Sequence, residues 1–222
     1  FRGVFSGFLA AQTLITASAT HREVSKLRQR QHLQEQLEWL ENPTDASIPE
    51  PTPCKDTGRW ILGVDSFQQW VQGTGVSSRL WCHGPPGVGK SMLASVVFQH
   101  IVKTVEDDTH VVLRFFCDFT SRKTQTKEAI WRSLMSQAIY HGRPSMIQTI
   151  EQFRQRTGSA RAASPKDLSG ILSLLCSTHQ VLVLLDGLDE LGDVNEMRSA
   201  VRPLVEADCR LLVFSRYLPE ID

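Results

Sequence analysis

The sequence lacks the features that mark several special classes of protein. Its five cysteines are odd in number and form no CxxC pair, which argues against a disulfide framework or a zinc site. Lysine plus arginine number 24 and aspartate plus glutamate number 24, so no net charge attracts nucleic acid or an anionic membrane. We therefore expect a cytoplasmic protein with reduced thiols, and neither nucleic acid nor a membrane among its partners.

A long, purely apolar segment is also missing. Residues 3–20 are uncharged and contain Ala17-Ser18-Ala19, which resembles a weak secretory cleavage site. Polar residues such as Gln12 interrupt the stretch, so it is too polar for a transmembrane helix. Because the chain starts at Phe1 rather than at a methionine, we expect its true N-terminus to lie upstream.

The sequence does contain enough apolar material for a folded domain. Of its 222 residues, 41% are hydrophobic and 22% are charged, a balance typical of one globular domain with a smaller attachment. From Leu9 to Leu40 there is neither proline nor glycine, and Leu33, Leu37 and Leu40 follow the i, i+4, i+7 spacing of an amphipathic helix. We predict a helix in this region.

A proline-rich linker follows the predicted helix. Pro43 ends the helix, and three further prolines between residues 49 and 53 favour extended backbone, because each fixes φ and disfavours helix before it. We predict a boundary at this linker. Residues 1–56 then form the N-terminal helix and linker, and residues 57–222 form the main domain, truncated at its C-terminal end.

Within the main domain, short apolar runs alternate with helical patterns. The predicted strands are Leu80–His83, His110–Phe116, Val181–Leu185 and Leu211–Phe214. The predicted helices are Ser66–Gln72, Lys90–Val105, Lys127–Tyr140, Ser145–Arg156, Ser164 or Pro165 to Thr178, and Val194–Glu206. Such alternation predicts an α/β fold, a three-layer sandwich with a central parallel sheet, and the continuous aliphatic run Val181–Leu185 is typical of a central strand.

A glycine-rich loop follows the first predicted strand and precedes a helix. Its pattern G-x-x-x-x-G-K-[ST] is formed by Gly84, Pro85, Pro86, Gly87, Val88, Gly89, Lys90 and Ser91. In this context the pattern predicts a P-loop, in which backbone N–H groups and the helix N-terminus surround phosphate oxygens. We expect Lys90 to reach the β- and γ-phosphates of ATP, and Ser91 to offer its hydroxyl to Mg²⁺.

A second motif lies at the end of the third predicted strand. Asp186 ends an aliphatic run, as in the Walker B motif, where the carboxylate holds Mg²⁺ directly or through water. Asp189 and Glu190 follow at once, and one of them is expected to orient or polarise an attacking water. The spacing does not decide which of the two, and solvated loop acids are the alternative for both.

The last predicted strand ends at Ser215-Arg216. A cation at this position is either a contact of the γ-phosphate or an ordinary surface arginine, and the chemistry alone leaves both open. We interpret His83, next to the glycine loop, as a strand-end residue rather than a catalyst.

Together these residues resemble a NACHT-type ATPase of the STAND class. The informative feature is Asp186-Gly187-Leu188-Asp189-Glu190, in which a small residue follows the first acid. Softer matches resemble the nephrocystin-3-like N-terminal subgroup that is abundant in fungal receptor-like proteins. These are Thr57–Leu62, Phe67–Trp70, Leu80–His83, Phe115–Phe119 and Trp131–Leu134.

The resemblance implies a signalling switch in an NLR-like receptor. ADP would hold a closed monomer, exchange for Mg-ATP would open it, and several copies would assemble as a homo-oligomer; slow hydrolysis would reset the switch. It also implies downstream helical, winged-helix and repeat domains (ankyrin, WD40 or TPR), a γ-phosphate-sensing role for Arg216, and a place near the base or ribose for Gly58–Trp60. Trp60 and Trp70 are otherwise interpreted as core aromatics.

Two other functions stay open. A metabolic P-loop kinase or nucleotide hydrolase would need an acceptor site and a lid, and no clear arginine-rich lid lies between Tyr140 and Ser164. A binding-only module that keeps its nucleotide for structure is also compatible with the sequence. A GTPase is disfavoured because no N/T-K-x-D motif follows the Walker B strand.

Overall fold

The structure is a computed structural model of the whole chain. It describes residues 23–28, 30–41, 51–53, 57–105, 110–118, 120, 125–140, 144–158, 162–207 and 209–218. The start of the predicted N-terminal helix, residues 9–22, and most of the proline-rich linker, residues 42–50, lie outside these ranges. Within them, no helix has the length and apolar character needed to cross a membrane.

The described elements alternate between helix and strand as the sequence predicts. The strands are β1 (Arg79–His83), β2 (His110–Phe116), β3 (Gln180–Asp186) and β4 (Arg210–Ser215). The helices are α2 (Asp65–Gln72), α3 (Lys90–Val105), α4 (Lys127–Tyr140), α5 (Pro144–Thr157), α6 (Pro165–Thr178) and α7 (Val194–Glu206). Two short 3₁₀ helices that the sequence patterns did not predict are η1 (Arg59–Gly63) and η3 (Leu188–Leu191).

Local side chains explain where several helices begin and end. Ser164 caps α6 in a capping box with Asp167, and the next residue, a proline, suits the first helical position. Asp193 caps α7 by accepting from the Asn195 backbone N–H. Helix α2 ends at Gly73, whose φ of 68° is available to glycine at little cost.

The four strands form one parallel sheet in the order β1-β4-β3-β2. Sequence neighbours β1 and β2 are therefore at opposite edges, and the chain crosses over the sheet between them. Because all strands run the same way, their carboxyl ends meet at one edge. The residues that follow β1, β3 and β4 thus come together there, although they are far apart in the chain.

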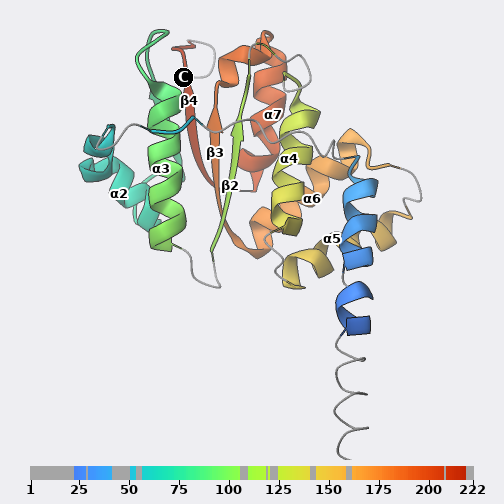
Figure 1. Cartoon of the computed structure of the whole chain (residues 1–222). Coiled ribbons are helices and arrows are strands. Elements are labelled where there is room, and N and C mark those ends of the chain that lie inside the picture. Colours follow the sequence, from blue (N-terminus) through green and yellow to red (C-terminus); the bar gives the residue numbers. More distant parts are fainter. Residues whose placement is uncertain are drawn as a thin grey trace, which may run out of the picture.

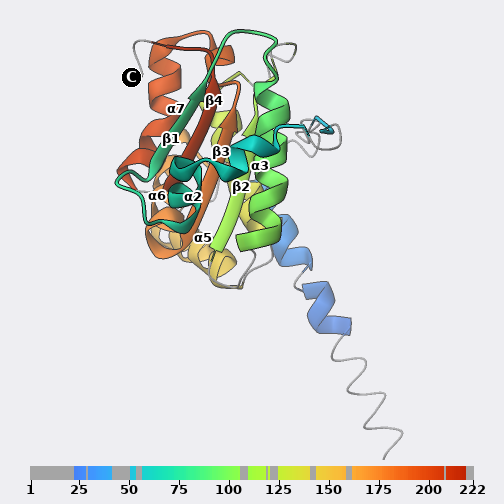
Figure 2. The same cartoon turned by 90° about the vertical axis from the view of Figure 1, so that its left-hand side faces the viewer.

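Helices cover both faces of the sheet, which makes three layers (Figure 1). Helices α2 and α3 pack on one face, where Leu182 and Leu184 of β3 join Phe214 of β4 in a buried cluster. Helices α4, α6 and α7 pack on the other face, where Val183 and Leu185 point. The turned view shows α3 in front of the strands (Figure 2). The predicted three-layer α/β sandwich is confirmed.

The end of the N-terminal helix packs against this second face. Residues 30–39 are helical, and Leu37, Trp39 and Leu40 belong to the same buried cluster as the side chains of α4 and α6. Arg132 of α4 donates hydrogen bonds to the carbonyl oxygens of Leu40 and Ala163. Burial of a tryptophan and two leucines indicates that this helix end contributes to the stability of the domain.

We therefore expect Trp39→Ala to destabilise the fold. Trp39 is 4% exposed, so its truncation should leave a cavity and lower the free energy of unfolding by about 3–5 kcal/mol. Leu27→Ala is the matched control, because Leu27 lies in the helical segment 23–28 and is 60% exposed. Urea unfolding of the two variants measures the difference. Equal unfolding free energies would show that the helix end does not stabilise the domain.

Candidate functional site

The carboxyl edge of the sheet is held together by backbone hydrogen bonds between the ends of the strands. The Gly84 N–H donates to the Ser215 carbonyl (3.2 Å), the Gly187 N–H to the Phe214 carbonyl (2.9 Å), and the Cys117 N–H to the Asp186 carbonyl (2.8 Å). These bonds continue the parallel pairing one step beyond the strands. They fix the starts of the glycine loop and the acidic loop relative to each other.

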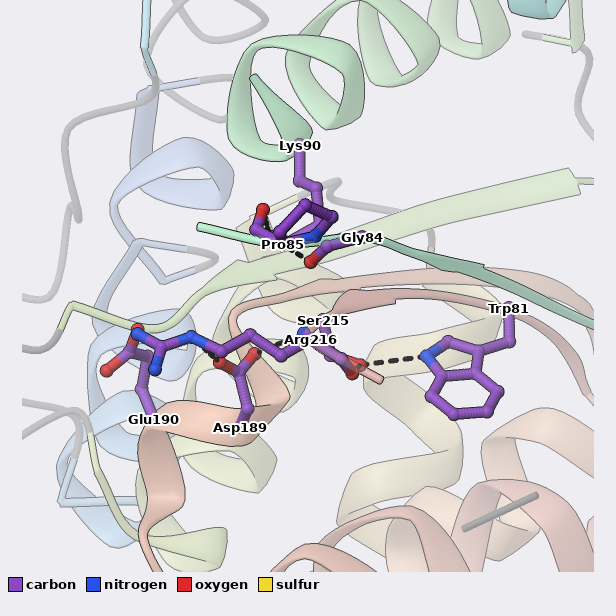
Figure 3. A network of polar contacts seen from close by, with 8 residues as sticks. All are labelled: Trp81, Gly84, Pro85, Lys90, Asp189, Glu190, Ser215 and Arg216. Atoms are coloured by element: carbon purple, nitrogen blue, oxygen red, sulfur yellow. Dashed lines mark hydrogen bonds and ion pairs between the residues drawn. The ribbon is translucent and has the colours of Figure 1, made fainter. Parts of the chain in front are cut away.

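The glycine loop connects β1 to the first turn of α3. Gly87 and Gly89 have φ values of 78° and 89°, which side-chain-bearing residues rarely adopt, so both positions require glycine. The loop from residue 85 to residue 89 is exposed. The Lys90 ammonium donates to the carbonyl oxygens of Gly84 and Pro85, both at 2.9 Å, and so lies over the loop (Figure 3).

Asp186 is a buried carboxylate at the end of β3, with 4% of its surface exposed. Burial raises its pKa from 3.8 to about 6, and the neighbouring Asp189 contributes in the same direction. A hydrogen bond with the Ser91 side chain, the charge of Lys90 and the Gly187 N–H act against this shift. A carboxylate in this setting favours a nearby cation.

The donor set of Ser91 and Asp186 fits Mg²⁺. The Ser91 hydroxyl lies close enough to the Asp186 carboxylate to lower its pKa, and both groups are hard oxygen ligands. Among the described residues, no three His, Cys, Asp or Glu side chains converge on one point. Mg²⁺ commonly takes one or two protein oxygens and completes its shell with phosphates and water. The two residues therefore suit Mg²⁺ that arrives with a polyphosphate, rather than a metal held by protein alone.

The acidic loop needs glycine directly after Asp186. Gly187 has a φ of 76° and leads into the 3₁₀ helix η3. A Cβ atom at this position would lie 3.0 Å from the Cys117 carbonyl oxygen, closer than most real Cβ contacts. Conformation and space both disfavour a larger residue. The small residue that distinguishes the motif in the sequence thus has a physical cause in this fold.

Asp189 and Glu190 differ in how firmly they are held. Asp189 accepts from the Arg216 backbone N–H (3.1 Å) and forms an ion pair with the Arg216 Nε (3.1 Å), and its side chain is 9% exposed. The Glu190 carboxylate lies 3.7 Å from an Arg216 terminal nitrogen and is 25% exposed. Figure 3 shows the Arg216 side chain extended toward both acids. Asp189 is thus engaged at two points, and Glu190 is the more accessible carboxylate.

Sequence reasoning missed a polar link between β1 and Arg216. The Trp81 indole N–H donates to the Ser215 hydroxyl (2.8 Å), and that hydroxyl donates to the Arg216 carbonyl (2.7 Å; Figure 3). Tyr217 stacks on Trp81, with ring centroids 5.6 Å apart. The only sequence signal was Ser215, a serine at the end of an apolar strand. Its partner Trp81 lies more than a hundred residues earlier in the chain, so no local pattern connects the two.

The other predictions for aromatic and glycine positions have mixed outcomes. Trp70 is 2% exposed and belongs to the core as predicted, but the prediction for Trp60 is wrong, because it is 67% exposed. The prediction failed because Trp60 lies on a short 3₁₀ helix, η1, that buries only Ile61. Gly58, just before η1, packs on Leu93 in α3. His83 is the last residue of β1, as predicted.

The structure therefore brings most of the sequence-predicted site residues to one edge. Lys90, Ser91, Asp186 and Asp189 interact directly or electrostatically. Arg216 reaches Asp189 and Glu190 rather than the glycine loop. Two independent motifs, separated by most of the domain, thus meet at the same edge of the sheet.

Comparisons with known proteins identify the family of this chain. The family model described as "Nephrocystin 3, N-terminal" matches residues 56–216. The vegetative incompatibility protein HET-E-1 of Podospora anserina is 24% identical over 179 residues, which is 76% of this chain but 13% of that protein. No solved structure matches significantly. Because the family match covers most of the chain, this protein belongs to the nephrocystin-3 N-terminal family, a NACHT-type subgroup, as its motifs predicted.

Proposed function

We propose that this chain binds Mg-ATP at the carboxyl edge of its sheet, and that it acts as the nucleotide-dependent switch of an NLR-like signalling receptor. The observation that carries the proposal is that the glycine loop, with the Lys90 ammonium over it, and the buried Asp186 meet at one edge of the sheet, where Ser91 and Lys90 both act on the Asp186 pKa. The two parts of a Mg-nucleotide site thus come from segments that are far apart in the sequence.

In this proposal the glycine loop binds the phosphates. Its backbone N–H groups and the N-terminus of α3 supply positive potential, and Lys90 exchanges its two carbonyl partners for the β- and γ-phosphate oxygens. Mg²⁺, when bound by Ser91 and Asp186, neutralises phosphate charge. The exposed Trp60 and the packing of Gly58 on α3 support a place for this segment near the base or ribose.

In this proposal Arg216, Asp189 and Glu190 have separate roles. Arg216 reports the γ-phosphate, because a cation at the end of β4 can stabilise its negative charge. Asp189 positions Arg216 through its two contacts. Glu190, more exposed and held only at 3.7 Å, orients the attacking water during slow hydrolysis.

At the level of the whole protein, we propose that ADP maintains a closed monomer and that ATP permits assembly of several copies. The relative HET-E-1 carries the name of a vegetative incompatibility protein, which supports a signalling role. This chain corresponds to 13% of that relative, so the helical, winged-helix and repeat domains belong to the proposal. The site itself is compatible with a metabolic kinase or a binding-only module, and the experiments below separate them.

Lys90→Ala should remove nucleotide binding and leave the fold intact. The ammonium is a surface group over the loop, whereas loss of a charge-assisted contact with phosphate typically costs about 2–5 kcal/mol, or roughly 30- to 4,000-fold in affinity. Lys103→Ala is the matched control, since Lys103 is exposed in the last turn of the same helix. Calorimetric titration with Mg-ATP measures both, and unchanged affinity in Lys90→Ala would contradict the loop assignment.

Asp186→Asn should stabilise the nucleotide-free fold and at the same time abolish Mg²⁺-dependent ATP binding. A carboxyl whose pKa is raised to about 6 by burial favours the protonated state in the fold, so its ionised form opposes folding above that pH. Without nucleotide at pH 8, the substitution should raise the free energy of unfolding by about 1–3 kcal/mol. The gain should shrink at pH 4.5, where Asp186 is protonated. Mg²⁺-dependent ATP binding should be lost.

A lower unfolding free energy for Asp186→Asn at pH 8 would show that the carboxylate stabilises the fold without a bound cation. Retained Mg²⁺-dependent binding would remove Asp186 from the metal site.

Glu190→Gln and Asp189→Asn should have different effects. Loss of a water-orienting group slows the chemical step about 10²- to 10⁴-fold, so Glu190→Gln should reduce single-turnover hydrolysis and keep ATP affinity. Asp189→Asn should instead reduce the preference for ATP over ADP, because it releases Arg216. Arg216→Ala should have the same effect, and the double variant should show no further loss.

The alternatives predict other results. Equal single-turnover rates in the wild type and Glu190→Gln would remove Glu190 from catalysis and favour a binding-only module. Additive effects of Asp189→Asn and Arg216→Ala would show that Asp189 does not act through Arg216. Rapid steady turnover with a small acceptor would favour a kinase.

A further inference from the structure

A second cavity lies at the opposite, amino edge of the sheet. It has a volume of about 640 Å³, within the usual range for small-molecule sites. The loop from Gly73 to Arg79, the end of α6 and the first residues of β3 and β4 line it. Figure 2 shows α2 and α6 at this end of the strands. The parallel sheet therefore separates this cavity from the candidate nucleotide site by the length of its strands.

The charged side chains among the described lining residues of this cavity are of one sign. Arg79 from β1 and Arg210 from β4 line it, and none of its described lining residues is aspartate or glutamate. His179 also lines it, but hydroxyl groups of Thr178 and Ser145 engage both of its ring nitrogens. The positive potential therefore comes from the two guanidinium groups.

Arg210 is partly buried and has no acidic partner among the described residues. It donates to the Val71 carbonyl at the end of α2 and to the Gln180 side-chain oxygen (3.4 Å), and both acceptors are neutral. Burial lowers the pKa of Arg210, and no carboxylate of the described part of the chain counters this effect. Buried cations in proteins are usually paired with an anion. A guanidinium also carries five N–H donors in a fixed fork, of which these contacts use two.

Arg79 adds a second guanidinium at the mouth of the cavity. It is exposed at the start of β1 and forms no ion pair with a described residue. Its strand lies next to β4 in the sheet, with Arg79 paired to Leu211, the neighbour of Arg210. The register places both arginines at the amino edge of the sheet, Arg79 on the face of Leu211 and Arg210 on the other face, and both line the cavity that lies at this edge.

We propose that this cavity binds a small molecule with an oxyanion group, a phosphate or a carboxylate, between Arg79 and Arg210. Guanidinium forks match the oxygens of both groups and bind them with two parallel hydrogen bonds. The cavity is lined mainly by polar groups and is partly open to solvent, so a hydrophilic ligand suits it. This proposal does not depend on the proposed nucleotide site.

The competing interpretation gives Arg210 a structural role only. Its hydrogen bond to the Val71 carbonyl caps the C-terminal end of α2, where a positive charge interacts favourably with the helix dipole. That role explains the placement of the Arg210 side chain. It does not explain why Arg79 lines the same cavity, or why the described lining residues include no acid. If the cavity binds an anion, adding one should shift the NMR signals of both arginines. If Arg210 has a structural role only, neither signal should shift in a saturable way.

The test uses Lys90→Ala, which weakens phosphate binding at the glycine loop. Its arginine Nε–H signals are followed by NMR during separate titrations with inorganic phosphate and succinate. We expect saturable shifts of the Arg79 and Arg210 signals with at least one of the two anions. The Arg202 signal, whose side chain is paired with Glu206, should stay in place. Phosphate and succinate distinguish the two kinds of oxyanion.

Arg79→Gln is the variant that tests cooperation between the arginines. It removes an exposed side chain, so the fold should be retained, and the anion affinity read from the Arg210 signal should fall about tenfold. Absence of saturable shifts with both anions would overturn the proposal and leave Arg210 as a structural contact. Equal affinity in Arg79→Gln and its parent would overturn the two-arginine site.

Discussion

The buried carboxylate of Asp186 is the constraint on which the organisation of the candidate site depends. It ends an otherwise apolar central strand and is almost inaccessible to solvent, so its charge must be compensated by nearby groups. Ser91 and Lys90 from α3 and the Gly187 N–H offset part of the cost of burying this charge, although burial still raises the pKa of Asp186 to about 6. These interactions link the first turn of α3 to the end of β3.

The roles around Asp186 follow from the parallel strand order. Because β4 lies between β1 and β3, Arg216 follows the strand that separates the two loops. Its backbone and guanidinium are both held by Asp189, while Glu190 stays more accessible. The link from Trp81 through Ser215 adds a connection between the sheet edge and Arg216. This link offers a route by which a change at Arg216 would reach β1 in the proposed switch.

Much of the fold and of the site could be predicted from local sequence. The continuous aliphatic run of β3, the capping residues of α6 and α7 and the glycine loop each carry a strong local pattern, and those elements lie where the patterns place them. The 3₁₀ helices η1 and η3 could not be predicted, because short turns lack a periodic pattern. The exposure of Trp60 and the Trp81–Ser215 bond depend on tertiary packing between distant segments. The distinction between Asp189 and Glu190 also needed the position of Arg216, which spacing alone does not provide.

The two edges of the sheet present different chemistry. At the carboxyl edge, acids and cations are balanced around a site that suits Mg²⁺ and a polyphosphate, whereas the described lining of the amino-edge cavity carries arginines without acids. The proposed nucleotide site lies at the first of these edges. It is tested most directly by a calorimetric titration of the unaltered chain with ATP, first with Mg²⁺ and then with EDTA. We expect saturable binding of one ATP per chain that weakens markedly in EDTA; absence of saturable binding in Mg²⁺ would contradict the proposed site.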